Sequence, residues 1–404
     1  MSLARAVAVA VAAAVAGTVM LAVAPANAAG LERAEQSPEG VAAAGAQTAD
    51  AEAPAAAYYN PAALAFQRGF TLQGGAVVTL AHATVTPASS GLPLASDTTF
   101  ATPSLYVTQR VAARFAVGVG LFDPFGASTQ YPRAGLVGGV GLELRALAVN
   151  PSVAIRPVPW LAVGFGIAVM PVTFEYVTAA ADGSNALLSL RGTGIGGNAG
   201  VLVRALPRWL DVGVSYRSAI DVELSSSAGK ATLPLPHTFS FGAASHPLPG
   251  LAITTDVRLT LWQELTSIRF VPNGPMPTDL VTLNWQNSIG VRAGAAYGLL
   301  ADDRGQPRLV VRIGGGWDQA PTSPAAVDPA FADGDRILVS AGAGARLGWV
   351  SLDAGYLVAV VRPYLGASGS QVARYQSLTH TVAVALTFRL PELGYRVDEI
   401  AFKR

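Results

Sequence analysis

The sequence contains no cysteine, which excludes disulfides, cysteine-ligated zinc and thiol catalysis. Charged residues make up only 13% of its 404 residues, about half of the usual share in a soluble protein. The 27 basic and 26 acidic residues nearly cancel, so nothing in the charge favours nucleic acid or an acidic substrate. Beyond the first 29 residues no apolar run reaches about 18 residues, which argues against membrane helices. Because the chain is nonetheless 51% hydrophobic and has 43 glycines, we expect many strands.

The first 28 residues have the features of a secretory signal peptide. Arg5 supplies a positive start, residues 6–23 form an apolar stretch of small residues, and residues 26–28 (ANA) fit a cleavage site. A transmembrane anchor is the alternative, but no basic stop-transfer cluster follows. We therefore expect a mature chain that begins near Ala29 and folds outside the cytoplasm.

Apolar and polar residues alternate with a period of two along most of the mature chain. In residues 378–388 (LTHTVAVALTF), the apolar face includes Val382, Val384 and Leu386. In residues 210–223 (LDVGVSYRSAIDVE), one expected face is aliphatic and the other polar. The aliphatic face includes Val212, Val214, Ile220 and Val222, and the polar face Asp211, Arg217, Asp221 and Glu223. A helix would scatter these residues, whereas a strand separates them.

This period and the turn signals between segments predict fourteen strands. Their expected spans are 70–85, 100–110, 114–122, 142–155, 161–176, 189–205, 210–224, 236–247, 251–264, 285–299, 308–318, 336–347, 350–362 and 378–390. Most reach the roughly 9–11 residues that a tilted strand needs to cross a bilayer. Their polar faces carry small residues and charges that suit a wet or plugged lumen. A soluble sandwich would also alternate, but these features favour a membrane barrel.

Connections of two lengths alternate along the chain. Short turns are expected at 156–159, 206–208, 247–250 and 347–348, and long loops at 86–99, 123–141, 265–284, 319–335 and 363–377. Short turns on one side and long loops on the other are typical of an outer-membrane barrel. An even strand number also lets one chain close without an edge. The predicted fold class is all-β, a 14-stranded antiparallel transmembrane β-barrel.

Residues 29–69 precede the first expected strand and do not alternate. They are rich in alanine and carry the acidic residues Glu32, Glu35, Glu39, Asp50 and Glu52. Such a segment is either a free periplasmic tail or a filling for the lumen, and the turn and aromatic residues at 58–62 (YYNPA) favour an ordered segment. The expected division is a signal peptide at 1–28, an N-terminal hatch or plug at 29–69, a barrel at 70–390 and a C-terminal tail at 391–404.

Several motifs occur in the order found in one known family. They are residues 59–64 (YNPAAL), 117–126 (VGVGLFDPFG), 150–156 (NPSVAIR), 160–164 (WLAVG), 210–218 (LDVGVSYRS), 284–285 (NW), 292–294 (RAG), 317–318 (WD) and 353–356 (DAGY). With these motifs, the chain resembles the outer-membrane long-chain fatty-acid transporters of the FadL/TodX type. The resemblance extends over nearly 300 residues.

The resemblance implies a fourteen-stranded barrel closed by an N-terminal hatch. It also implies that apolar ligands are captured outside, bound inside, and released sideways or through the plug without an energy source in the protein. The sequence departs from the family in two places. The loops nearest 177–188 and 225–235 are short, which puts the outer capture site in doubt. Sixteen residues follow Phe388, either as a periplasmic tail or with Phe402 as the terminal aromatic signal.

The candidate functional residues fall into three groups. Asn60, Pro61 and Ala62 form the plug motif, where we expect a fixed turn whose asparagine caps backbone donors. Gly118 and Gly120 could weaken a strand and permit a kink with a side opening, or could instead allow close packing of the plug. Four arginines expected in the lumen could bind a ligand carboxylate or pair with aspartates to hold the plug: Arg217, Arg258, Arg292 and Arg312.

No enzymatic motif is apparent. The four histidines lie far apart, there is no G-x-S-x-G, and residues 192–197 (GTGIGG) lack the helix that a phosphate-binding loop must open. We expect no catalytic role, no cofactor and no metal. The predicted function is diffusion-driven uptake of hydrophobic small molecules, with fatty acids first, by a monomer in the outer membrane of a Gram-negative bacterium. Uptake of monoaromatic hydrocarbons is the alternative, and a general porin or structural barrel is an alternative of another class.

Overall fold

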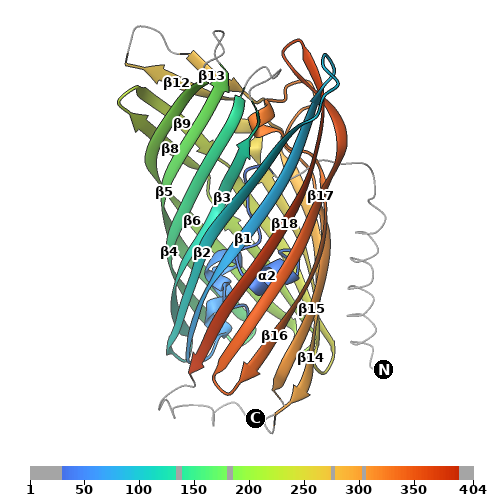
Figure 1. The fold of residues 1–404 in the computed structure, drawn as a ribbon. Coiled ribbons are helices and arrows are strands. Elements are labelled where there is room, and N and C mark those ends of the chain that lie inside the picture. The colour runs from blue at the N-terminus through green and yellow to red at the C-terminus, as the bar shows by residue number, and fades with distance from the viewer. Residues whose placement is uncertain (1–29, 133–138, 180–184, 274–277, 303–305, 391–404) are drawn as a thin grey trace.

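The computed structural model describes residues 30–132, 139–179, 185–273, 278–302 and 306–390, and shows a tall antiparallel barrel with a short N-terminal segment inside (Figure 1). The expected signal peptide and C-terminal tail lie outside these residues. The strands are β1 (Phe70–Pro87), β2 (Leu94–Ala112), β3 (Phe115–Gln130), β4 (Gly139–Val158), β5 (Leu161–Ala179), β6 (Asn185–Leu206), β7 (Leu210–Arg217), β8 (Ile220–Ser226), β9 (Gly229–Leu235), β10 (His237–Leu248), β11 (Leu251–Leu261), β12 (Ser267–Pro272), β13 (Thr278–Thr282), β14 (Ser288–Ala301), β15 (Pro307–Asp318), β16 (Arg336–Leu347), β17 (Val350–Ser368) and β18 (Gln371–Leu390).

The wall of the barrel contains fourteen strands, as predicted. Strands β7 and β8 are two halves of one wall strand, interrupted at residues 218–219, and β9 and β10 are two halves of the next. Strands β12 and β13 form a hairpin in the loop between β11 and β14, and β12 pairs with the start of β9. The barrel closes where β1 pairs with β18 along its whole length. Closure leaves no unpaired edge strand, which a membrane span requires.

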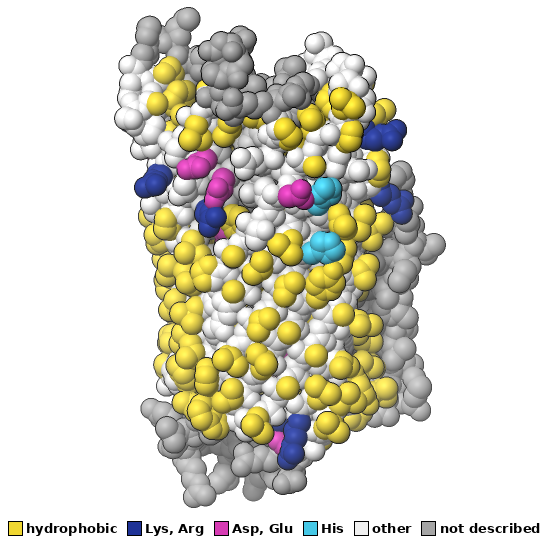
Figure 2. Space-filling view, viewed as in Figure 1, with side chains coloured by type: hydrophobic (Ala, Val, Ile, Leu, Met, Phe, Trp, Pro, Cys, Tyr) yellow, Lys and Arg dark blue, Asp and Glu magenta, His cyan; other side chains and the backbone are white. Residues whose placement is uncertain are grey.

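The lower part of the barrel carries its aliphatic side chains on the outside. On β18, Val384 and Leu386 are both 46% exposed, whereas Ala383 and Ala385 between them are buried against the interior. Figure 2 shows a broad hydrophobic band around the lower two thirds of the visible face, with charged side chains mainly above it. The predicted orientation, aliphatic rows toward lipid and small or polar rows toward the lumen, therefore holds in this band.

Three expected long loops are wrong, one of them at 123–141, where β3 continues to Gln130 and β4 begins at Gly139. Strands β1 and β2 continue through most of residues 86–99, and β17 and β18 through most of 363–377, so these hairpins extend above the hydrophobic band. Alternation weakens there because both faces of a strand above the membrane can be polar, although the backbone ladder continues. At the opposite end the connections are tight, and Gly250 and Gly348 adopt positive φ in two of these turns.

The plug consists of residues 30–69 and lies within the barrel. Its elements are α2 (Pro38–Ala42), α3 (Ala56–Tyr59) and the 3-10 helix η1 (Pro61–Phe66), and nearly all of their residues are buried. A further 3-10 helix, η2 (Trp262–Glu264), follows β11, and η3 (Pro329–Phe331) lies between β15 and β16. Within the described residues, no helix has the length and apolarity needed to cross a membrane.

Candidate functional site

The inner wall of the upper barrel is apolar from β4 to β9. On β4, Leu142, Leu144, Ala146 and Ala148 point inward and are at most 3% exposed. The row continues on the neighbouring strands with Ala168, Met170, Val172, Phe174, Leu190, Ile220, Val222, Leu224, Leu233 and Leu235. We call this lining the apolar sleeve. It is an environment that can accept a hydrocarbon chain, since each buried methylene contributes about 0.8 kcal/mol.

The apolar sleeve reverses the sidedness of the lower barrel, and one expected face is therefore wrong. Val212 and Val214 face outward as predicted, but Ile220 and Val222 point inward, and Asp221 and Glu223 are exposed outside. The interruption at residues 218–219 shifts the alternation by one residue. Above the lipid band the outer surface meets water, so the polar face belongs outside and the aliphatic face becomes available to the lumen.

Aromatic side chains form the floor of the apolar sleeve. The plug residues Tyr58 and Tyr59 pack edge to face with ring centroids 4.8 Å apart, and Tyr58 packs on Phe122 of β3 at 5.0 Å. Tyr106 of β2 also stacks on Phe122, with ring centroids 6.2 Å apart. The two plug tyrosines also donate hydrogen bonds to the backbone oxygens of Arg33 and Ala34. The floor is therefore shared between plug and wall, so movement of the plug would open it.

Arg217 lies at this aromatic floor. Its guanidinium carbon is 4.9 Å from the centroid of the Tyr58 ring and 5.3 Å from that of Phe122, and its Nη2 donates to the Tyr58 backbone oxygen at 3.0 Å. Among the described residues it forms no ion pair. Of the four predicted arginines, Arg217 alone combines a place beside the apolar sleeve with donors that no described carboxylate engages.

The other three predicted arginines are paired with carboxylates. Arg258 bonds Glu32 of the plug at 3.2 Å, and Arg312 bonds Asp353 at 2.9 Å. Arg292 bonds both oxygens of Asp318 at 2.7 and 2.8 Å and also reaches Glu35 of the plug at 3.2 Å. Two of these pairs tie plug carboxylates to the wall, so they hold the plug in place and leave little capacity for a ligand carboxylate.

The plug motif is fixed by its asparagine. Asn60 accepts a hydrogen bond from the backbone nitrogen of Ala62 at 3.1 Å and donates to the backbone oxygens of Thr48 (2.8 Å) and Val201 of β6 (3.1 Å). Pro61 opens η1 at its first position, where its missing N–H costs nothing. The wall accommodates this turn through glycines. A Cβ on Gly200 would lie 2.0 Å from the Asn60 oxygen, and one on Gly164 would lie 2.4–2.6 Å from the backbone of Pro61 and Ala62.

The irregularity of β3 lies above the two glycines predicted to cause it. Gly118 and Gly120 sit in regular ladders with β2 and β4 and accommodate the plug, since added Cβ atoms would approach Leu64 and Ala57. The register with β4 shifts between Phe122 and Phe125 instead, and the β2–β3 ladder ends at Leu121. This register shift follows from Pro124, which lacks the N–H that a ladder needs.

The start of the plug occupies this break in the wall. The Arg33 nitrogen donates to the Pro124 oxygen, and the Gly126 nitrogen donates to the Leu31 oxygen, both at 2.9 Å. The Arg33 side chain then spans three strands, with bonds to Thr79 of β1 (2.9 Å), Thr102 of β2 (3.0 Å) and Asp123 of β3 (3.4 Å). Arg33 was not predicted from the sequence, because a lone arginine in a non-alternating segment carries no signal of its partners.

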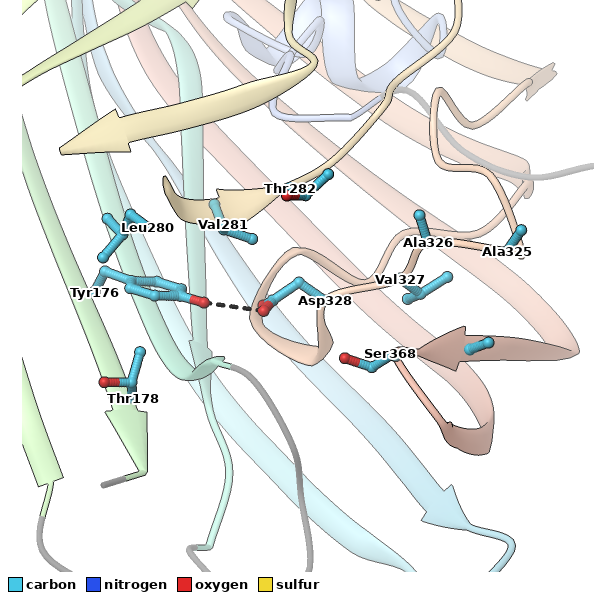
Figure 3. Close-up of a pocket in the computed structure, with 12 residues that line it drawn as sticks. Tyr176, Thr178, Leu280, Val281, Thr282, Ala325, Ala326, Val327, Asp328 and Ser368 are labelled. Carbon is cyan, nitrogen blue, oxygen red and sulfur yellow. Dashed lines mark hydrogen bonds between the residues drawn. The ribbon is translucent and has the colours of Figure 1, made fainter. Parts of the chain in front are cut away.

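At the extracellular end, the loops line an open cavity of about 350 Å³. Tyr176, Leu280, Val281, Val327 and Asp328 contribute to its lining, and Figure 3 shows the Tyr176 hydroxyl directed at the Asp328 carboxylate, which accepts its bond at 2.9 Å. Asp328 also accepts bonds from the backbone nitrogens of Gly139 and Ala330, and burial raises its pKa. The cavity lies above the apolar sleeve, where a ligand would first contact the protein.

The loop between β15 and β16 also contacts the start of the plug. Asp333 accepts a hydrogen bond from the backbone nitrogen of Gly30 at 2.5 Å, and Asp335 accepts one from Ala320 at 3.0 Å. Burial raises the pKa of Asp333 to about 7 and, together with the Asp333 charge, raises that of Asp335 to about 8. In the described part of the chain, no three potential metal ligands cluster together.

Comparisons with known proteins agree with this architecture. Outer membrane protein P1 of Haemophilus influenzae is 26% identical over a match of 399 residues, gaps included. The match covers 81% of this chain and 85% of that protein. A FadL homologue from Pseudomonas aeruginosa has the same fold, with a TM-score of 0.79 at 18% identity, covering 89% of this chain and 99% of that one. The toluene transporter TbuX of Ralstonia pickettii gives a TM-score of 0.66 at 17% identity, covering 88% and 98%.

A family described as outer membrane protein transport protein (OMPP1/FadL/TodX) matches residues 19–389. The resemblance seen in the sequence motifs is thereby confirmed, as is the outer-membrane location. The family consists of transport proteins rather than enzymes. The chain belongs to the OMPP1/FadL/TodX family of outer-membrane transport proteins, whose substrates are hydrophobic.

Proposed function

We propose that the protein carries long-chain fatty acids across the outer membrane by diffusion. The observation that supports this most is Arg217, a guanidinium without a described carboxylate partner at the inner end of the apolar sleeve. A fatty acid needs an apolar lining for its chain and a cation or donor for its carboxylate, because an uncompensated charge is costly to bury. The apolar sleeve supplies the first requirement and Arg217 the second.

The route begins at the extracellular cavity beside Tyr176 and Asp328 and continues down the apolar sleeve to the aromatic floor. The described walls of the sleeve contact one another, so a ligand must displace side chains as it enters. Met170 lies in this lining and can repack at low cost because its side chain is unbranched. Beyond the floor, the plug must move or the break between β2 and β3 must widen.

The proposal is tested by oleate uptake in a strain that lacks its own fatty-acid transporter and expresses this chain. The wild type should restore uptake. Arg217→Met should weaken oleate binding to the purified protein by about 10- to 150-fold, because a hydrogen bond to a charged group contributes about 1.5–3 kcal/mol. Arg217→Lys keeps the charge and should retain part of the affinity. If Arg217→Met binds oleate as tightly as the wild type does, the assignment of the carboxylate site is wrong.

Uptake of monoaromatic hydrocarbons is a second candidate, supported by the rings around the sleeve. Trp262 and Trp285 pack edge to face with ring centroids 4.9 Å apart. The ring centroid of Phe331 is 6.4 Å from those of both Trp285 and Phe174. A neutral hydrocarbon has no carboxylate, so Arg217→Met should leave toluene uptake unchanged. Toluene uptake without oleate binding would favour this candidate over the first. A general porin would instead conduct ions steadily in planar bilayers.

A further inference from the structure

Two indole N–H groups are buried beside the apolar sleeve without an acceptor. They belong to Trp262 of η2, which is fully buried, and to Trp285, which lies between β13 and β14 and is 3% exposed. Both Nε1 atoms are inaccessible, and neither has a hydrogen-bond partner among the described residues. A buried donor without a bond destabilises the protein, so an unpaired one in a native structure requires an explanation. We call these two residues the indole pair.

The indole pair is surrounded by aromatic rings. The two indoles pack edge to face with ring centroids 4.9 Å apart, and the centroid of Phe125 of β3 is 6.2 Å from that of Trp262. The centroid of Phe331 of η3 is 6.4 Å from that of Trp285. All four residues belong to the same buried hydrophobic cluster as the apolar sleeve. These contacts supply ring faces but no oxygen, and a bond from an N–H to a ring face is too weak to replace an oxygen acceptor.

A third buried indole shows what the pair lacks. The Nε1 atom of Trp317 also has no bond of good geometry, but the Asp335 carboxyl lies beside it and interacts with it. In the described part of the chain, no carboxylate, amide or hydroxyl oxygen accepts from Trp262 or Trp285. A buried water needs several polar partners, including acceptors for its own hydrogens, and ring faces supply none. The missing acceptor therefore has to come from a ligand.

The indole pair lies on the path of a ligand that enters from outside. The edge of Trp262 next to Nε1 faces the start of the plug inside the barrel, since a Cβ on Gly30 would lie 3.0 Å from its Cε2 and Cζ2 atoms. Phe331 separates Trp285 from the extracellular cavity. Its ring centroid is 6.4 Å from that of Trp285 and 5.8 Å from that of Tyr176, which lines the cavity (Figure 3). A ligand in this cavity reaches the indole pair once Phe331 has moved.

The chemistry of the indole pair selects an uncharged oxygen. An indole N–H donates but cannot accept, and it carries no charge. A carboxylate is costly to bury without a cation, so it is better placed at Arg217 than here. A plain hydrocarbon chain would leave both donors unpaired, whereas a ketone or hydroxyl oxygen on the chain would accept from them. A site built to bond a substrate oxygen discriminates against the analogue that lacks it.

We propose that the indole pair is a second polar binding point, which receives a ketone or hydroxyl oxygen carried on the hydrocarbon chain of the ligand. The inference rests on the proposed function and narrows its substrate class to oxygenated fatty acids. Arg217 contacts Phe122 and Trp262 contacts Phe125, so the two points are separated by roughly three positions of β3, about 10 Å. A ligand with its carboxylate at Arg217 therefore places an oxygen near the middle of its chain at the indole pair.

The test is binding of matched ligands to the purified full chain in neutral detergent. The probes are stearate and 10-oxostearate, which differ by one ketone. The wild type should bind 10-oxostearate about 2- to 13-fold more tightly for each bond made, the net effect of a hydrogen bond between neutral groups. Trp262→Phe and Trp285→Phe keep a ring and remove the N–H, so this preference should fall while the affinity for stearate does not. Trp160→Phe, in the exposed β4–β5 turn, is the matched control and should change nothing.

A series of oxostearates with the ketone moved along the chain needs no variant, so it is independent of any folding defect. Affinity should be highest with the ketone near mid-chain, whereas an effect of polarity alone would not depend on its position. The inference is overturned if stearate and 10-oxostearate bind equally, if the position of the ketone has no effect, or if both phenylalanine variants keep the wild-type preference. Binding of stearate in any of these cases leaves the proposed function standing.

Failure of both acids to bind would overturn the proposed function. The indole pair is then judged with uncharged probes, a mid-chain ketone and the alkane of equal length. Tighter binding of the ketone would support the indole pair as an oxygen-binding site without a fatty acid, and equal binding of the two would overturn it.

Discussion

Replacing Gly200 with alanine should displace the plug from its contact with β6 while the barrel stays folded. A Cβ at this position would lie 2.0 Å from the Asn60 side-chain oxygen, far inside contact distance. Asn60 has no free direction in which to move, because its amide donates to the backbone oxygens of Thr48 and Val201 and its oxygen accepts from Ala62. The substitution therefore forces the plug motif away from β6.

The size of the effect follows from the bond that is lost. Of the three hydrogen bonds of Asn60, only the bond to the Val201 backbone oxygen joins the plug to the wall, and it contributes about 0.5–1.5 kcal/mol. Its loss shifts the balance between seated and displaced plug by roughly 2- to 13-fold, and the overlap of the added Cβ with the Asn60 oxygen acts in the same direction. The strand itself is unaffected, because alanine is compatible with the extended backbone of β6.

Single-channel recording in planar bilayers measures this displacement directly. Gly200→Ala should open an ion-conducting lumen much more often than the wild type does, and its heat-modifiable migration on gels should still report a folded barrel. Gly197→Ala is the matched control, since it lies on the same strand and its added Cβ would meet its nearest atom only at 3.8 Å. If neither variant shows more channel openings than the wild type, the contact between Asn60 and β6 does not hold the plug, and the reasoning fails.

Three further predictions concern the closure of the loops, the break in β3 and the lipid face. Burial raises the pKa of Asp333 to about 7 although the Gly30 N–H favours its ionised form, so ionisation opposes the buried, closed state of this loop, and the loop should open more readily as pH rises from about 4 to 7. Hydrogen exchange of the Gly30 amide, corrected for the intrinsic rate, should show this dependence, and Asp333→Asn should abolish it. Arg33→Met should destabilise the protein in urea by about 3–5 kcal/mol because it leaves Asp123 buried without its cation, and Asp123→Asn in the same chain should recover part of the loss. Val384→Arg on the lipid face should cost about 2–4 kcal/mol in bilayer refolding, and a near-zero effect would contradict the assigned orientation.

The strand number and the barrel could be predicted because a lipid-facing strand must alternate. The row at Val382, Val384 and Leu386 is required by the membrane, and its spacing can be read without knowing any partner. The contacts of Arg33 and Tyr58 could not be predicted in this way. Each depends on strands that are distant in the sequence, and a single side chain in a non-repeating plug gives no periodic signal.

The pairing of the arginines shows the same limit at the candidate site. Arg217, Arg258, Arg292 and Arg312 all follow from the inward polar faces, so the sequence could place them in the lumen. It could not separate Arg217 from the others, because that distinction depends on which carboxylates lie close in space. Arg258 is neutralised by Glu32 of the plug, and Arg292 and Arg312 mainly by wall aspartates, whereas the Tyr58 ring lies beside Arg217.

The inversion of the aliphatic face is the step that joins fold to function. On β4, the outward residues Val153 and Ile155 belong to the lipid band, whereas Glu143 and Arg145 above them pair with each other at 2.6 Å on the outer surface. The inward row changes in the opposite sense, from Asn150 and Ser152 to Leu142 and Leu144. Above the lipid, where water bathes the outer face, the buried leucines form an apolar core inside the barrel and stabilise it. The same inversion on β5 and β8 supplies the apolar lining that the proposed route requires, and its height on each strand marks where this lining begins.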